Sequence, residues 1–156
     1  MCHDEVGWDD GANWTDWKDI NGRSGHRAPA AYMIRLVRVT GRVVTLNRLL
    51  ERDRNGILCI GNATDMEDRR RDFIRGMDTG TGHSSANLLY LIRQYTAFDQ
   101  VFPNARYEYR FLGAEDKAEA EQFEATLLRR YFRRYGELPP LNSAMPGRHM
   151  PWNEGA

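Results

Sequence analysis

The 156-residue chain has little cysteine, almost no lysine and no long apolar run. Its two cysteines, Cys2 and Cys59, are too few for the disulfide framework of a small secreted domain. The longest apolar stretches, such as residues 30–34, are far shorter than the roughly 20 residues of a membrane-spanning helix. The first residues are acidic and include no apolar segment, so we expect no signal peptide. These absences predict a soluble, cytoplasmic protein that binds no membrane.

The chain also has no net charge, because 22 basic residues balance 22 acidic ones. This balance argues against a protein that coats nucleic acid indiscriminately. The charge is unevenly distributed, however, with a net of −3 in residues 1–29, +4 in residues 30–110 and −1 in residues 111–156. Twenty of the bases are arginine, which matches phosphate well, although GC-rich coding would produce the same bias. Any attraction for a polyanion is therefore expected to be focused in a cleft, with modest binding outside it.

The length suits one domain, and changes in composition divide it into three parts. Residues 1–29 are expected to be an irregular arm that holds three of the four tryptophans, Trp8, Trp14 and Trp17. The indoles either pack onto the domain or bind a partner. Residues 30–142 form the domain, with an insert at about 40–56, and residues 143–156 form an irregular tail.

Three short segments are rich in strand-forming residues, at 32–39, 57–60 and 107–112. The first two are expected to be antiparallel neighbours. Helices should fill most of the remaining domain, which predicts an α+β fold with a small, three-stranded, mainly antiparallel sheet flanked by helices.

The first helix is expected to begin at a capping box formed by Thr64 and Glu67, and to run to about Arg75, with Gly76 ending it. A glycine- and serine-rich segment at 77–87 follows, then a short helix at 88–95. The longest helix is predicted at 114–135.

One carboxylate lies on the apolar face of that longest helix. At about 100° per residue, Glu124 falls in the middle of a stripe of core residues, namely Ala120, Phe123, Leu127, Leu128, Tyr131 and Tyr135. A buried carboxylate is costly unless it is paired, hydrogen-bonded or bound to a metal. Glu124 is therefore a functional candidate, and a buried salt bridge is the alternative.

Two arginines, Arg69 and Arg70, flank the apolar stripe of the first helix, while Arg71 and Arg75 face away from it. A guanidinium directed inward or into a cleft requires a carboxylate or a phosphate partner. The helical wheel alone does not decide between Arg69 and Arg70.

These features, taken in order, resemble the GIY-YIG nuclease family. The family's first motif ends in a strand tyrosine, matched by Ala31-Tyr32-Met33-Ile34, and the second is matched by Cys59-Ile60-Gly61. The spacing of the residues after the second motif matches Arg69 to the family's arginine. The family's glutamate motif matches the segment from Glu124 to Leu128, and its closing asparagine, which follows a proline-containing turn, matches Asn142. Some members carry a histidine at about the position of His83.

The resemblance implies an endonuclease that hydrolyses DNA phosphodiester bonds. Tyr32 would deprotonate or orient the attacking water, Arg69 would brace the phosphate, and Glu124 would hold one divalent cation, Mg²⁺ or Mn²⁺. It also implies that Asn142 positions the phosphate or the glutamate, with a plain turn residue as the alternative. His83 would be an auxiliary base or a phosphate contact, unless it is simply solvated. A small nuclease that cuts both strands often works as a homodimer, which is one expectation here.

The chain departs from the family pattern at several positions. Cys59 replaces the second tyrosine, Asn62 stands where many members have lysine, and Arg70 occupies a usually aliphatic position. We assign Arg70 and Asn62 to substrate binding. The insert at 40–56 lengthens the separation of the first two motifs. Because Cys59 could mark a degenerate copy, the alternative function is a catalytically inactive domain that binds DNA or a protein.

Overall fold

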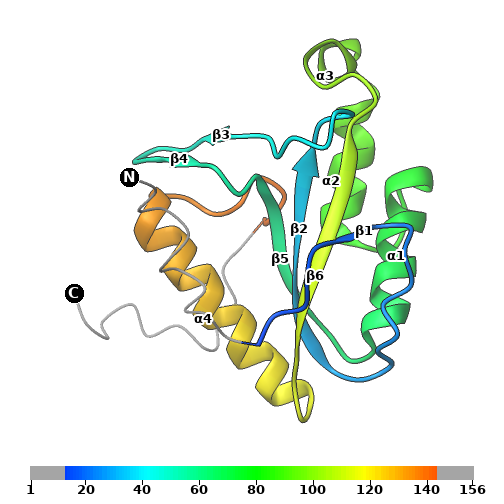
Figure 1. The fold of residues 1–156 in the computed structure, drawn as a ribbon, viewed down its shortest axis with the longest axis vertical. Coiled ribbons are helices and arrows are strands. Elements are labelled where there is room, and N and C mark those ends of the chain that lie inside the picture. The colour runs from blue at the N-terminus through cyan, green and yellow to red at the C-terminus, as the bar shows by residue number, and fades with distance from the viewer. Residues whose placement is uncertain (1–12, 144–156) are drawn as a thin grey trace.

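The computed structural model describes residues 13–143 and shows an α+β fold (Figure 1). Its elements in chain order are β1 (Lys18–Asp19), β2 (Ala30–Val37), β3 (Leu46–Asn47), β4 (Arg52–Asp53), β5 (Ile57–Ala63), α1 (Met66–Thr79), α2 (Ser84–Arg93), α3 (Thr96–Val101), β6 (Arg106–Gly113) and α4 (Lys117–Tyr135). In this part of the chain, no helix is long and apolar enough to cross a membrane.

The main sheet is antiparallel and has the strand order β1-β6-β2-β5. The prediction that the first two long strands are antiparallel neighbours is confirmed, because β2 pairs with β5 and Tyr32 lies opposite Gly61. The predicted number of three strands is wrong. The segment expected to be an irregular arm contributes β1, which pairs with the middle of β6. The insert forms a separate hairpin from β3 and β4.

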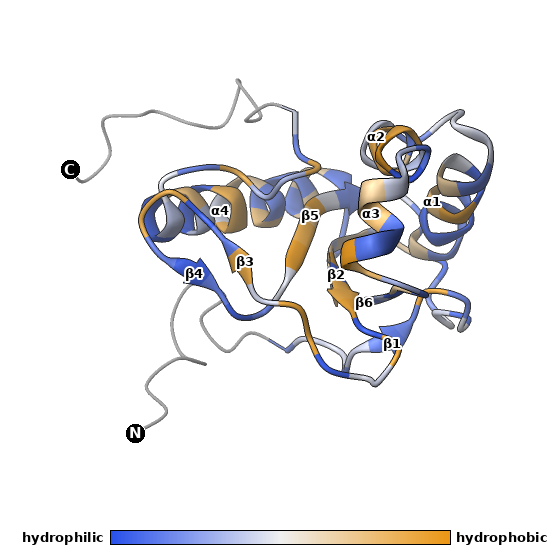
Figure 2. Cartoon of the chain, turned by 90° about the horizontal axis from the view of Figure 1, so that it is seen from above, coloured by the Kyte–Doolittle hydropathy of each residue, from blue (hydrophilic) through white to orange (hydrophobic). Residues whose placement is uncertain are grey.

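Helices cover both faces of the sheet, with α1 and α2 on one side and α4 on the other (Figure 2). Tyr32 and Ile34 of β2 point into the core on the α1–α2 side, whereas Ala31 and Met33 point into the core beneath α4. A strand that is buried on both faces has no reason to alternate apolar and polar residues. This explains why β2 reads as a nearly continuous apolar run.

Two tryptophans of the N-terminal segment pack against the core on the α4 side. The Arg110 guanidinium stacks over the rings of both Trp14 and Trp17, and Arg35 stacks over Trp17. These two indoles therefore pack onto the domain, while Trp8 lies outside the described residues.

The start of α1 differs from the predicted capping box. Asp65, rather than Thr64, is the N-cap, and its carboxylate accepts a hydrogen bond from the Asp68 amide at 2.9 Å. Glu67 does not reach back along its own helix. Its carboxylate instead accepts hydrogen bonds from the amide and hydroxyl of Ser24, both at 2.8 Å, which ties the N-terminal segment to α1.

The end of α1 was also predicted too early. The helix continues to Thr79 and ends at Gly80, which adopts a left-handed conformation at φ 73°. Gly76 is instead an interior, buried residue at the contact between α1 and α2, where a Cβ atom would lie only 2.8 Å from that of Ala86. The segment at 84–101 forms two helices, α2 and α3, instead of one short helix.

Gly76→Ala tests this contact. A glycine-to-alanine change inside a helix normally stabilises a protein by roughly 0.5–1 kcal/mol. Here the added methyl group overlaps Ala86, so we expect a loss of about 1–3 kcal/mol in the free energy of unfolding. Urea denaturation measures this difference, and an increase in stability would contradict the close packing of α1 on α2.

Candidate active site

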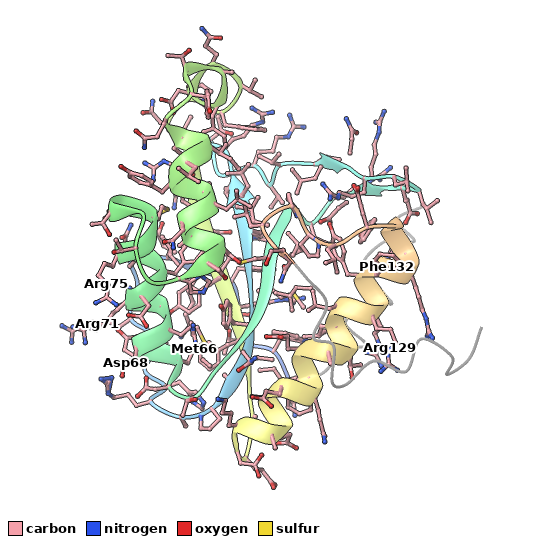
Figure 3. The ribbon with its side chains drawn as sticks, turned by 180° about the vertical axis from the view of Figure 1, so that it is seen from behind. Met66, Asp68, Arg71, Arg75, Arg129 and Phe132 are labelled. Carbon is pink, nitrogen blue, oxygen red and sulfur yellow. The ribbon has the colours of Figure 1, made fainter. Side chains whose placement is uncertain are left out.

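A cleft of about 360 Å³ lies at the edge of the sheet formed by β5. Figure 3 looks onto this edge, with α4 on one side of β5 and the α1–α2 pair on the other. The cleft brings together six of the seven site residues selected from the sequence: Tyr32, Asn62, Arg69, His83, Glu124 and Asn142. They come from β2, β5, α1, the residue before α2, α4 and the segment after α4.

Tyr32 reaches the cleft by passing across Gly61 of the neighbouring strand. A Cβ atom at Gly61 would overlap the Tyr32 hydroxyl and ring, so only glycine leaves room for the phenol. Burial raises the pKa of Tyr32 well above its ordinary value of 10.0, and the positive charge of Arg69 partly opposes this rise. The phenol is therefore protonated at neutral pH when the cleft contains only protein groups.

His83 lies at the N-cap of α2, and its ring is buried rather than solvated on a loop as one reading of the sequence proposed. Its Nδ1 accepts a hydrogen bond from the Ala86 amide at 3.3 Å, and its Nε2 lies 2.7 Å from the Tyr32 hydroxyl. Burial, reinforced by the charge of Arg69, lowers the pKa of His83 from 6.5 to about 4. The imidazole is thus neutral at neutral pH.

The bond to Ala86 decides where the imidazole carries its proton. Since Nδ1 accepts from a backbone amide, the proton of the neutral ring lies on Nε2. Nε2–H therefore donates to the oxygen of Tyr32, and the phenolic proton is free to point elsewhere. A donor aimed at the oxygen favours the phenolate over the phenol, so His83 opposes the effect of burial.

Arg69 projects from α1 into the same cleft. Within residues 13–143, its guanidinium makes no ion pair with a carboxylate. Its charge acts on both Tyr32 and His83. An unpaired guanidinium in a cleft is suited to binding an anionic oxygen.

Arg70 is the one predicted site residue that the structure places elsewhere. Its guanidinium forms an ion pair with Glu67, at 2.5 Å, and donates to the Ile20 carbonyl at 2.8 Å. The side chain is buried against the N-terminal segment, and it does not line the cleft. Its assignment to substrate binding is therefore not supported, because its donors are used to fix the N-terminal segment to α1.

Glu124 faces the cleft from α4, and its Oε2 accepts a hydrogen bond from Asn62 Nδ2 at 2.7 Å. Burial raises the pKa of Glu124 above its ordinary value, while the Asn62 bond and Arg69 oppose this rise. Among residues 13–143, no arginine forms the buried salt bridge that was the alternative reading. Asn62, predicted to bind substrate, lines the cleft and orients the glutamate.

The donor set is small, but it fits one hard cation. No three histidine, cysteine, aspartate or glutamate side chains in the described range gather into a complete metal-binding group. Mg²⁺ in phosphate-processing sites keeps several waters and takes only one or two carboxylates together with substrate oxygens. Glu124 supplies one such carboxylate, and a nearby cation would favour its ionised form.

Asn142 contributes to the cleft by holding the edge of β5. Its Oδ1 accepts from the Ile60 amide, and its Nδ2 donates to the Ile60 carbonyl, both at 2.9 Å. This side chain therefore takes the place of a neighbouring strand. Both of its polar atoms are used, which favours a positioning role over direct contact with phosphate.

Sequence reasoning did not find three serines that also line the cleft, Ser84, Ser85 and Ser143. Ser85 donates to the Leu141 carbonyl at 3.0 Å, which joins the start of α2 to the segment after α4. Cys59 is buried under this junction, and burial raises the pKa of its thiol to about 12. The pair of serines at 84 and 85 is the only sequence signal for the contact between Ser85 and Leu141.

Comparisons with known proteins add no further evidence, because no protein-family model, curated protein or solved structure matches the chain.

The buried His83 predicts a specific dependence of stability on pH. Its pKa is about 4 in the folded state and near 6.5 when unfolded, so between these values only the unfolded chain gains the proton. The stability is complete above pH 6.5 and falls by up to about 3 kcal/mol as the pH drops to about 4. Urea denaturation across this range measures the loss.

His83→Asn provides the control, because asparagine also caps a helix but does not titrate. We expect this variant to lose much less stability over the same pH range. Equal losses in the two proteins would contradict the assignment.

Proposed function

We propose that this protein is a metal-dependent endonuclease of the GIY-YIG type that hydrolyses phosphodiester bonds in DNA. The observation that carries the proposal is the convergence of Tyr32, Arg69 and Glu124 in one cleft. Glu124 was selected by its position on an apolar helix face, Tyr32 and Arg69 were selected by the family resemblance, and the three residues come from different elements. A hydroxyl, an unpaired guanidinium and a partly buried carboxylate are the groups that phosphoryl transfer requires.

In the proposed reaction, the oxygen of a water molecule forms a bond to phosphorus while the bond to the leaving oxygen breaks. Tyr32 first releases its own proton to solvent, and the resulting phenolate then takes a proton from the attacking water, while the leaving oxygen takes a proton from solvent. The His83 Nε2–H and the Arg69 charge stabilise this phenolate, and that help is needed because burial raises the pKa of Tyr32 above its ordinary value of 10.0.

Arg69 has a second role at the phosphate. As negative charge develops on the oxygens around phosphorus, the guanidinium donates hydrogen bonds to them from a fixed position on α1. Glu124, held by Asn62, would bind the divalent cation. When bound, this cation supplies positive charge beside the phosphate and the attacking oxygen.

A second candidate function is a catalytically inactive domain that binds DNA or a protein. One observation favours it: burial holds both Tyr32 and Glu124 towards their neutral forms. Binding that survives Glu124→Ala, without any metal-dependent cleavage, would support this alternative.

Plasmid nicking in the presence of Mg²⁺ tests the proposed activity. Glu124→Ala, Arg69→Ala and Tyr32→Phe should each lower the cleavage rate by about 10²–10³, since they remove the groups proposed to hold the cation, stabilise the charge on the phosphate and activate the water. Arg71→Ala is the matched control, because Arg71 lies on the same helix but is exposed and points away from the sheet (Figure 3).

The control should cleave like the wild type. If the wild-type protein cleaves no supercoiled, single-stranded or branched DNA with Mg²⁺ or Mn²⁺, the proposal is wrong.

Asn62→Ala tests the orientation of the glutamate. Removing a hydrogen bond to a metal-binding carboxylate commonly weakens metal affinity by about 10–100-fold. We therefore expect the Mg²⁺ concentration for half-maximal cleavage to rise by this factor, with much of the rate recovered at saturating Mg²⁺. Asn21→Ala, at an exposed asparagine outside the cleft, should leave the titration unchanged. A lower rate with no change in the Mg²⁺ midpoint would contradict the assigned role of Asn62.

A further inference from the structure

We propose that the outward face of α2 binds a single-stranded segment of the DNA substrate, as an apolar track that leads away from the cleft. The track consists of Leu88, Leu91 and Tyr95, which we call the apolar row. The inference rests on the proposed function and deepens it, because it names the class of DNA that the cleft prefers. This class is a duplex or branched molecule that carries an unpaired strand.

Helix α2 has apolar residues on two sides, although only one side packs into the domain. Its buried residues are Ser85, Ala86 and Leu89. The apolar row faces outward, with Leu88 37%, Leu91 56% and Tyr95 71% exposed. A surface helix ordinarily carries polar residues opposite its core face. The packing of the domain therefore does not account for the apolar row.

The residues of the apolar row form one line along the helix. At about 100° per residue, Leu88, Leu91 and Tyr95 fall within a sector of about 60°. The Tyr95 amide donates to the Ile92 carbonyl at 3.1 Å, so the chain keeps a helix-like turn just beyond the end of α2. Tyr95 therefore stays close to the line set by the two leucines.

The same line begins in the cleft. Ser84, the first residue of α2, falls in the same sector, is exposed and lines the cleft together with His83. Figure 3 shows α2, in light green, on the same side of the molecule as the cleft. From Ser84 to Tyr95 the line is roughly 16 Å long, at about 1.5 Å per residue, which is the length of up to about five stacked nucleotides. A strand that leaves the cleft along α2 therefore meets the apolar row.

The chemistry of the apolar row matches unpaired bases. Such bases present flat faces that stack on aromatic rings and pack against apolar side chains. Within residues 13–143, no aromatic ring or cation stacks on Tyr95. Bases inside a duplex are already stacked on both sides, so the apolar row favours single-stranded over double-stranded DNA.

No charged side chain lies on the apolar row. Arg93 is the one charged residue of α2, and at about 100° per residue it falls on the opposite side of the helix. A surface that binds phosphates requires cations along its length, whereas stacking with bases does not. The apolar row therefore suits bases, and Arg69 in the cleft remains the group that binds the phosphate.

A second copy of the chain is the main alternative occupant, because uncharged apolar faces also lie at the centre of subunit interfaces. The position of Ser84 argues against this occupant. A copy seated along the whole line would cover a residue that lines the cleft and would obstruct entry of the substrate. Three side chains are also a small patch beside the roughly 800 Å² that each partner buries in a stable dimer.

Binding to tailed and blunt DNA tests the inference, in a Glu124→Ala parent that prevents cleavage. The row variant adds Leu91→Ser and Tyr95→Ala to this parent. The matched control adds Val39→Ala and Leu49→Ser, at exposed apolar residues outside α2. The probes are a duplex of about 20 base pairs, blunt or with a single-stranded tail of about ten nucleotides at a 5′ or a 3′ end. Fluorescence anisotropy measures affinity, and thermal melts check folding.

The parent should bind at least one tailed duplex about fivefold or more tightly than the blunt duplex, which is the effect of one stacked base. This advantage should change little between about 50 and 200 mM salt, because stacking neutralises few phosphates. It should fall below about twofold in the row variant and persist in the control. Tyr95→Phe should also keep it, because the ring remains. Equal affinity of the parent for tailed and blunt DNA, or an equal loss in both variants, would overturn the inference.

Light scattering distinguishes DNA from a second copy as the occupant. The mass of the protein in solution should be the same for the parent and the row variant. A dimer of the parent that Leu91→Ser and Tyr95→Ala dissociate would overturn the inference, because the apolar row would then be an interface between copies.

A cleavage assay separates this inference from the proposed function. With Glu124 intact, the preferred tailed duplex should have a lower KM than the blunt duplex, and the row variant should lose this difference. If the wild type binds tailed DNA through the apolar row but never cleaves DNA, only the proposed activity fails. If it cleaves plasmid DNA but a tail changes neither affinity nor KM, only the inference about the apolar row fails.

Discussion

The pairing of Tyr32 with Gly61 across β2 and β5 is the contact on which the rest of the cleft depends. In this register, the phenol crosses the edge strand at the one residue without a side chain. The next residue, Asn62, then points to the opposite face of the sheet, where it reaches Glu124 on α4. A shift by one residue would exchange these faces and separate the phenol from the carboxylate. The edge position matters equally, because an inner strand would place the sheet itself between the two groups.

At the outer edge of β5, the segment after α4 makes hydrogen bonds that a further strand would otherwise make. Asn142 bonds both polar groups of Ile60, and the Leu141 amide donates to the Leu58 carbonyl at 2.8 Å. The segment after α4 thus covers one stretch of β5 and leaves the part near Asn62 free to line the cleft. The contacts that keep this edge of β5 from pairing with another molecule therefore also hold in place the part of β5 that lines the cleft.

Local patterns in the sequence predicted which side chains face the cleft more accurately than they predicted the helices and strands that carry these side chains. Glu124 stood out because a carboxylate interrupts an apolar helical stripe, and the structure places it facing the cleft. Arg69 and Arg70 are neighbours with similar positions on the wheel, and only the long-range contacts of Arg70 with Glu67 and Ile20 separate them. The extension of α1 to Thr79 and the burial of His83 depend on α2 packing against Gly76. The strand β1 is two residues long, so its existence depends on pairing with β6, which no local pattern records.

Burial and charge oppose one another in the cleft, and their balance bears on whether a chain without net charge can bind the proposed DNA substrate. In the cleft, burial opposes the charged forms of Tyr32, His83 and Glu124, while the positive charge of Arg69 favours the ionised forms of Tyr32 and Glu124. The net charge of zero is thus compatible with a local positive charge at Arg69, because the total is a sum over the whole chain. Attraction at such a site acts over about 8 Å at physiological salt, so the local arrangement of charges governs binding more than the total charge.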